Sequence, residues 1–107
     1  MKILLDECVT KRLAGLLAGH EVATVPRMKW SGLRNGPLMA KAVESGFDAL
    51  LTIDKNLRYQ QSIGKHNLTL VIFDTPSSKI EVLKDYVPDF LKMLPTMKKG
   101  SFYVIER

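Results

Sequence analysis

The stretch Ala49-Leu50-Leu51-Thr52-Ile53-Asp54-Lys55-Asn56 decides the fold of this chain. Its apolar run over residues 49–53 predicts a strand that is buried on both faces of a parallel sheet. The run stops at Asp54, where the strand must leave the sheet. The first residues repeat this arrangement, since Lys2-Ile3-Leu4-Leu5 leads directly into Asp6-Glu7. Parallel α/β sheets bind ligands at the carboxyl ends of their strands, so two strands that each end in an acid predict one shared acidic site.

Predicted strands alternate with predicted helices along the rest of the chain. Further strands are expected over residues 20–25, 68–73 and 102–105. This alternation predicts an α/β fold of three layers (αβα), with a five-stranded, mainly parallel sheet and right-handed crossovers. The common strand order 2-1-3-4-5 would make the strands that precede Asp6 and Asp54 neighbours. Asp48 and Glu44 would then lie at the opposite edge, outside the site.

Four helices are expected between these strands. The first has Val9, Leu13, Leu16 and Leu17 at helical spacing and ends at Gly19, and the second runs from about residue 35 to Gly46. A short helix is expected over residues 57–63, closed by Gly64. The last follows Pro76, where Ser78 and Glu81 form a capping-box pattern and Pro88 predicts a break near Val87.

Composition predicts one globular domain over residues 1–107, with 46% hydrophobic and 25% charged residues. The net charge of +5 favours polyanionic partners. The single cysteine, Cys8, excludes an internal disulfide, and we interpret it as a small apolar residue in the first turn of a helix. No signal peptide or apolar run of membrane-spanning length is evident, so we expect a cytoplasmic protein that does not associate with membranes.

The strand-end acids are the candidate metal ligands. Hard divalent cations such as Mg²⁺ and Mn²⁺ are bound by one or a few carboxylates together with water and phosphate oxygens. Asp6 and Asp54 would be direct ligands, and Glu7 or Asp74 would act directly or through water. In the alternative interpretation, Asp6 and Asp54 only cap the helices that follow them.

Basic residues gather where acids are absent. No acid lies between Glu21 and Glu44, a segment that also contains Trp30. Basic side chains can hold a nucleic-acid backbone. Trp30 could either stack on a base or cover the edge of the core. The candidate nucleic-acid-binding residues are Arg27, Lys29, Arg34, Lys55 and Arg58.

Several stretches resemble the PIN-like family, small bacterial and archaeal proteins related to the VapC-type toxins of toxin–antitoxin modules. Those that carry the resemblance are Leu4-Leu5-Asp6-Glu7, Trp30-Ser31-Gly32-Leu33-Arg34-Asn35-Gly36, Gly46-Phe47-Asp48, and Leu51-Thr52-Ile53-Asp54-Lys55-Asn56-Leu57 with Tyr59-Gln60-Gln61. The resemblance implies a PIN-like fold and a ribonuclease that depends on Mg²⁺ or Mn²⁺, with Asp6, Asp54 and Glu7 as catalytic residues. It also implies RNA as substrate and a small antitoxin-like protein as partner, with a homodimer as a further option.

The chain departs from the family pattern in three places, one of which is the opening of the first helix, Cys8-Val9-Thr10, where the family uses polar residues and proline. The start of the helix before the central strand reads Asn35-Gly36-Pro37 where PIN nucleases usually carry an acid, and Asn56 stands where a second acid often follows the strand. These departures keep open a PIN-like module that binds RNA or protein without turnover. A phosphoacceptor receiver domain is a third alternative, in which Thr75 would supply a hydroxyl. Receivers need a lysine at the end of the last strand, and this chain has Glu106-Arg107 there.

Overall fold

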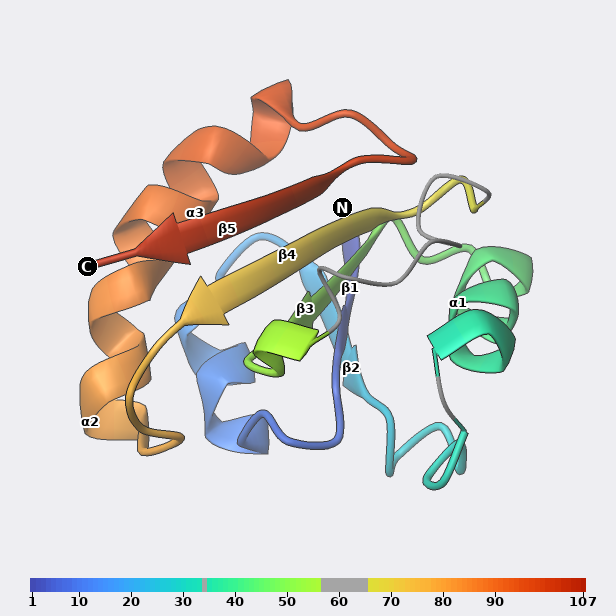
Figure 1. The fold of residues 1–107 in the computed structure, drawn as a ribbon, viewed down its shortest axis with the longest axis horizontal. Helices are drawn as coiled ribbons and strands as arrows, with labels where there is room; N and C mark the ends of the chain where they lie inside the picture. Colours follow the sequence, from blue (N-terminus) through green and yellow to red (C-terminus); the bar gives the residue numbers. More distant parts are fainter. Residues whose placement is uncertain (34, 57–65) are drawn as a thin grey trace.

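Five parallel strands form the centre of the computed structural model, which describes residues 1–33, 35–56 and 66–107. Their order is β2-β1-β3-β4-β5, and each neighbouring pair is parallel (Figure 1). The α/β class and the predicted strand order are therefore confirmed. The strands are β1 (Lys2–Leu5), β2 (Glu21–Thr24), β3 (Ala49–Thr52), β4 (Thr69–Asp74) and β5 (Phe102–Glu106).

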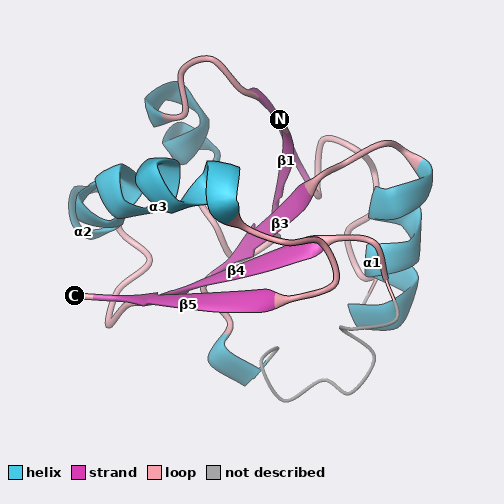
Figure 2. Cartoon of the chain, turned by 90° about the horizontal axis from the view of Figure 1, so that it is seen from above, coloured by secondary structure: helices cyan, strands magenta, loops and turns pink. Residues whose placement is uncertain are grey.

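Helices cover both faces of this sheet (Figures 1 and 2). One face packs against α1, and the other packs against the 3-10 helix η1 together with α2 and α3. The three layers follow from the parallel topology, because each crossover must return over one face of the sheet. The helices are η1 (Lys11–Leu16), α1 (Asn35–Glu44), α2 (Ile80–Leu83), η4 (Lys84–Tyr86), α3 (Val87–Met93) and η5 (Leu94–Thr96).

The two faces of the sheet contribute to two hydrophobic clusters. Leu4, Leu50 and Leu70 point toward α1, and their neighbours Leu5 and Leu51 point toward the opposite layer. Because both faces are buried, β1, β3 and β4 read as continuous apolar runs rather than as alternating ones. This is why the central strands could be located from the sequence.

The end of α1 sets the start of β3. Gly46 adopts a positive φ of 82°, which an L side chain rarely tolerates. The N–H of Phe47 donates to the carbonyl of Ala42 (2.9 Å), and the N–H of Gly46 donates to that of Val43 (3.0 Å). These two bonds form a Schellman motif, which ends the helix and directs the chain into the sheet.

The first helix differs from the prediction. It is a 3-10 helix that begins at Lys11, so Cys8 precedes it instead of lying in its first turn. The Thr10 hydroxyl accepts from the N–H of Arg12 and caps it. The tighter 3-10 winding leaves Leu16 exposed (42%), although Leu13 is buried as expected.

The start of the last helical segment also differs. The Ser78–Glu81 capping box is wrong, because α2 begins at Ile80 and its N-cap residue, Lys79, makes no side-chain cap bond. Instead the hydroxyl of Ser77 accepts from the N–H of Lys79 (3.1 Å).

The predicted break before Pro88 is confirmed. The chain passes through η4 and starts α3 at Val87, with the proline in the first turn. A proline is tolerated there because the first N–H groups of a helix have no partner within it.

Some predictions lie outside the described residues. These are the helix over 57–63 with Gly64, and the basic side chains of Arg34 and Arg58. None of the helices that the structure describes has the length and apolarity that a membrane span requires.

Candidate functional site

Asp6 and Asp54 emerge from neighbouring strands at the same edge of the sheet. Leu5 of β1 lies opposite Leu51 of β3, and the backbone N–H of Asp6 donates to the carbonyl of Leu51 (2.9 Å). Asp54 follows the last residue of β3 by two positions. Both acids therefore lie at the carboxyl ends of the strands, here called the carboxyl edge of the sheet, where α/β proteins bind ligands.

The hydroxyl of Thr52 links these two acids. Thr52 is fully buried (0% exposed), and its Oγ1 donates to Oδ2 of Asp6 at 2.7 Å. The same oxygen accepts from the backbone N–H of Asp54 at 3.0 Å. One hydroxyl thus orients the Asp6 carboxylate and fixes the segment that carries Asp54. No role for Thr52 is expected from the sequence, where its only signal is a hydroxyl inside an apolar run, two residues before an acid.

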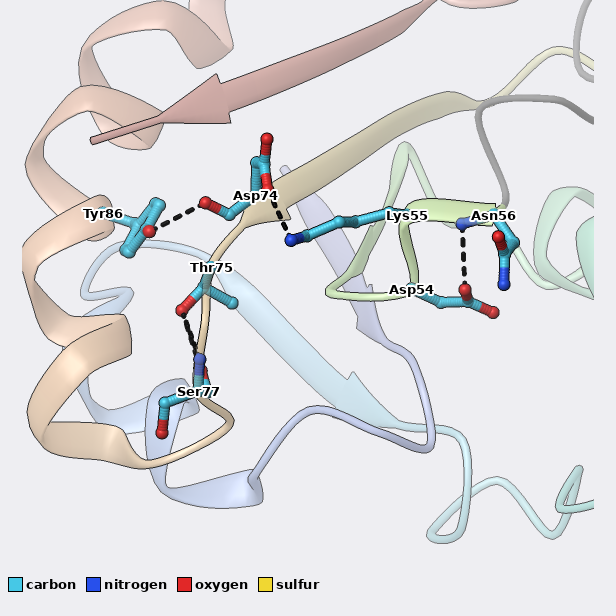
Figure 3. Close-up of polar contacts among 7 residues, drawn as sticks. All are labelled: Asp54, Lys55, Asn56, Asp74, Thr75, Ser77 and Tyr86. Atoms are coloured by element: carbon cyan, nitrogen blue, oxygen red, sulfur yellow. Dashed lines mark hydrogen bonds and ion pairs between the residues drawn. The ribbon is translucent and has the colours of Figure 1, made fainter.

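Backbone N–H groups donate to Oδ1 of each acid without neutralising its charge. The backbone N–H of Glu7 donates to Oδ1 of Asp6 (2.8 Å), and that of Asn56 donates to Oδ1 of Asp54 (3.0 Å; Figure 3). Within residues 1–33, 35–56 and 66–107, neither carboxylate has an ion-pair partner. Each oxygen has more than one lone pair, so both carboxylates retain the capacity to accept a cation.

The other predicted acids behave differently. Glu7 is exposed, and only its backbone N–H takes part in the hydrogen bonds around Asp6. Asp74, at the end of β4, pairs with Lys55 at 2.8 Å between Oδ1 and Nζ. Figure 3 shows the Lys55 side chain directed toward Asp74 and away from the carboxylate of Asp54. Asp74, a predicted metal ligand, and Lys55, a predicted RNA contact, therefore form an ion pair with each other.

The donor set at this edge is small. Among the residues that the structure describes, no group of three or more His, Cys, Asp or Glu side chains is placed to hold one ion. Asp6 and Asp54 alone would still suit a hard cation such as Mg²⁺ or Mn²⁺, which commonly keeps several waters and takes only one or two carboxylates. Two carboxylates suit a hard cation of this class better than Zn²⁺ in a closed site, which needs nitrogen or sulfur ligands.

Cys8 lies beside Asp6 and Thr52. Its Sγ lies 3.7 Å from Oδ2 of Asp6 and 3.5 Å from Oγ1 of Thr52. Although the residue is exposed overall, partial desolvation raises the pKa of the Cys8 thiol, the hydrogen bond between Cys8 and Thr52 opposes this shift, and the Asp6 charge adds to it. The sulfur is therefore protonated at neutral pH and contributes no negative charge to the site.

The turn after β2 brings two of the predicted RNA contacts to this edge. Arg27 and Lys29 are both exposed, and the hydroxyl of Thr24 accepts from the N–H of Arg27 (3.2 Å). Because β2 neighbours β1, this turn follows the strand end next to Asp6. Trp30 is half-buried and packs edge-on against Phe47, with ring centroids 6.0 Å apart. This contact favours the interpretation in which Trp30 covers the core.

Thr75, the hydroxyl that a receiver domain would use, has an internal role. It is buried, donates to the carbonyl of Ser77 (2.8 Å) and accepts from the N–H of the same residue (3.2 Å; Figure 3). Nearby, the hydroxyl of Tyr86 donates to the carbonyl of Asp74 (2.9 Å). These contacts shape the turn between β4 and α2 and leave Thr75 engaged with its own backbone.

Comparisons with protein-family models, with curated proteins and with solved structures found no significant match to this chain.

Proposed function

We propose that the carboxyl edge of the sheet binds one Mg²⁺ or Mn²⁺ ion between Asp6 and Asp54 and hydrolyses RNA, as in PIN-like endoribonucleases. One observation carries this proposal: the buried Thr52 hydroxyl bonds both the carboxylate of Asp6 and the backbone N–H of Asp54, at the ends of neighbouring strands. A buried polar link of this kind orients one carboxylate and fixes the segment that carries the other, which favours a metal site.

The lack of cationic partners for Asp6 and Asp54 within the described residues supports the same function. Asp48 and Asp74 each pair with a lysine, whereas Asp6 and Asp54 have none among the described residues. Two negative charges held on adjacent strands repel each other unless a cation lies between them. A divalent ion would relieve this repulsion, and for that reason we assign it to this pair.

The roles of the residues follow from their positions. Asp6 and Asp54 hold the ion, Thr52 orients Asp6, and Arg27 with Lys29 attracts the phosphate backbone toward the edge. When bound, the ion lowers the pKa of a coordinated water and stabilises charge on a phosphoryl oxygen. Glu7 is exposed beside Asp6 and would act through water.

We further propose that the chain is the toxin component of a toxin–antitoxin module and that a small protein partner controls it. This part depends on the resemblance to VapC-related proteins. Induced expression should arrest growth, and the Asp54→Asn variant should relieve the arrest. Equal growth with both proteins at equal abundance would contradict the toxin assignment and leave the hydrolytic assignment in place.

The direct test measures metal binding and cleavage separately. Mn²⁺ affinity is obtained by electron paramagnetic resonance titration, and cleavage is followed on a mixed RNA pool with metal added or chelated. Asp6→Asn and Asp54→Asn should each lower Mn²⁺ affinity at least tenfold and cleavage at least a hundredfold. Asp48→Asn is the matched control, because it makes the same change at the amino ends of the strands. If Asp48→Asn lowers Mn²⁺ affinity as much as Asp54→Asn does, the assignment of the site is contradicted.

The main alternative is a module that binds RNA without turnover, which the two-carboxylate donor set favours. Wild-type protein that binds Mn²⁺ and RNA but cleaves nothing in any metal would establish this alternative. The Pro37→Glu variant probes the same question from the other side. It places an acid in the first turn of α1, where PIN nucleases usually carry one, and we expect higher Mn²⁺ affinity and faster cleavage.

A further inference from the structure

β5 forms one edge of the sheet, and part of its backbone points away from its neighbour. The carbonyl of Ser101 accepts from the N–H of Leu70 (3.1 Å), which directs Ser101 toward β4. Because backbone groups alternate along a strand, those of Tyr103 and Ile105 also face β4. The N–H and C=O groups of Phe102, Val104 and Glu106 therefore face outward, and in Figure 1 β5 is the outermost strand on its side.

In the described part of the chain, the opposite edge is better protected than the β5 edge. In β2 the carbonyl of Thr24, which faces outward, accepts from the N–H of Met28 (3.1 Å), so the following turn covers the strand end. β2 also has only four residues. β5 has an uninterrupted apolar run from Phe102 to Ile105, a regular register with β4 and no proline. Edge strands normally carry charges, prolines or bulges that prevent pairing.

The exposed side chains of β5 are also unusual for an edge. Phe102 is 45% exposed, and Val104, on the same face of the strand, is half-buried. Aromatic and β-branched residues that face each other across antiparallel strands stabilise the pairing. A strand that matched β5 in length would cover Phe102 and complete the hydrogen bonds of three outward-facing residues.

The charges at the two ends of β5 indicate which strand this would be. Lys98 precedes β5 and Glu106 ends it, and both are exposed. The nearby cations are already engaged, because Lys99 pairs with Asp48 (3.0 Å) and the guanidinium of Arg107 donates to the carbonyl of Asp85 (2.7 Å). Lys98, in the turn before β5, and Glu106, its last residue, thus carry opposite charges on the two sides of the strand. A second copy in antiparallel orientation places each beside its opposite, whereas a parallel copy would place like charges together.

We propose that two copies of this chain associate through β5 and form one continuous ten-stranded sheet around a two-fold axis. In the register centred on Tyr103, Phe102 of each copy faces Val104 of the other. Each Glu106 then faces Gly100 of the other copy, two residues from Lys98. Such an interface is isologous, as closed dimers require. It is independent of the hydrolytic activity proposed above.

The experiment measures mass in solution by light scattering and sedimentation equilibrium over a range of protein concentrations. The wild type should reach about twice the 12.1 kDa of one chain. Lys98→Glu and Glu106→Lys should each weaken the dimer at least tenfold, because like charges would then face each other. The double variant should restore it, which also shows that the exchanged residues are compatible with folding. Glu21→Lys, on the other edge strand, is the control and should leave the dimer unchanged.

Three results would overturn the proposal. A wild type that stays monomeric at every concentration would leave the β5 edge to a strand of another protein. If Glu21→Lys weakens the dimer and Lys98→Glu does not, the interface lies at β2 instead. A double variant that dimerises no better than the single variants would show that Lys98 and Glu106 do not meet across the interface.

Discussion

The two ends of the sheet use aspartates in different ways. At the amino end, Oδ2 of Asp48 accepts from the N–H of Lys2 (2.8 Å), and Oδ1 pairs with Lys99 (3.0 Å). At the carboxyl end, Asp6 and Asp54 accept hydrogen bonds but have no lysine partner among the described residues. An aspartate with both oxygens engaged by a backbone amide and a cation stabilises the fold. Two aspartates whose negative charge is not paired with a lysine are suited to binding a cationic ligand.

The amino end shows how complete such engagement can be. The Lys2 ammonium donates to the carbonyl of Ser45 (2.7 Å) and lies 4.6 Å from the centre of the Phe47 ring. The backbone hydrogen bond from Lys2 lowers the pKa of Asp48, and the Lys99 partner lowers it further. Lys2 and Asp48 therefore fasten β1 to the start of β3, which fixes the register that places the acids at the other end.

The largest expected effect comes from breaking the link at the carboxyl end. Thr52→Val keeps the shape of the side chain but removes the hydroxyl, so Asp6 loses a donor and the N–H of Asp54 loses an acceptor. We expect Mn²⁺ affinity to fall about tenfold and the free energy of unfolding to fall by about 1–2 kcal/mol. Titration with Mn²⁺ and urea unfolding measure the two effects separately.

Thr52→Ser separates position from packing. It retains the hydroxyl and removes a buried methyl group, so stability should fall by about 1 kcal/mol while Mn²⁺ affinity stays near the wild-type value. Loss of affinity in the serine variant equal to that in the valine variant would mean that Thr52 acts only through the fold.

The second effect concerns charge around the carboxyl end. RNA affinity should fall steeply between 50 and 200 mM salt, conditions chosen because phosphate contacts release counterions. Replacing Arg27 and Lys29 by Gln should reduce the slope of log affinity against log salt by about 1.4, at about 0.7 for each contact on a single strand. Lys41→Gln with Lys92→Gln, on α1 and α3, is the control and should keep the slope. Affinity that ignores salt would show that this surface does not bind RNA.

The third effect is at the amino end and depends on pH. The pKa of Asp48 is lower in the folded protein than in the unfolded chain. Its contribution to stability is therefore present above about pH 4, the ordinary value, and is lost as pH falls through the folded value. Asp48→Asn should lower the free energy of unfolding by about 1 kcal/mol at pH 7, and this difference should shrink as pH falls below about 4, both measured by urea unfolding. A difference that persists in acid would assign the effect to packing.

The smallest effects come from the two surface ion pairs. Lys55–Asp74 and Lys99–Asp48 have similar exposure, with lysine side chains 47% and 43% exposed. Lys55→Gln and Lys99→Gln should each change stability by less than about 1 kcal/mol, as exposed pairs usually do. Only Lys55→Gln frees a carboxylate at the carboxyl end. A rise in Mn²⁺ stoichiometry in that variant alone would show that Lys55 keeps Asp74 out of the site.

The fold could be predicted because the signals that specify it are local. Both faces of β3 and β4 are buried, so their residues form apolar runs that end in acids, and alternation with helices fixes parallel pairing. The Thr52 link and the Lys55–Asp74 pair could not be predicted. They depend on which side chains meet across strands, and a sequence pattern does not specify rotamers. The 3-10 winding of η1 was missed because its apolar spacing also fits an α-helix.

The hydrogen bond between Asp6 and Thr52 joins residues that are 46 positions apart. Pairing of β1 with β3 therefore closes a long loop of chain, which is slow compared with forming a helix. The two acids come together only when this pairing is complete. In a refolding experiment, Mn²⁺ binding would thus appear late, after helical circular dichroism has recovered, and it would act as a kinetic reporter of sheet assembly.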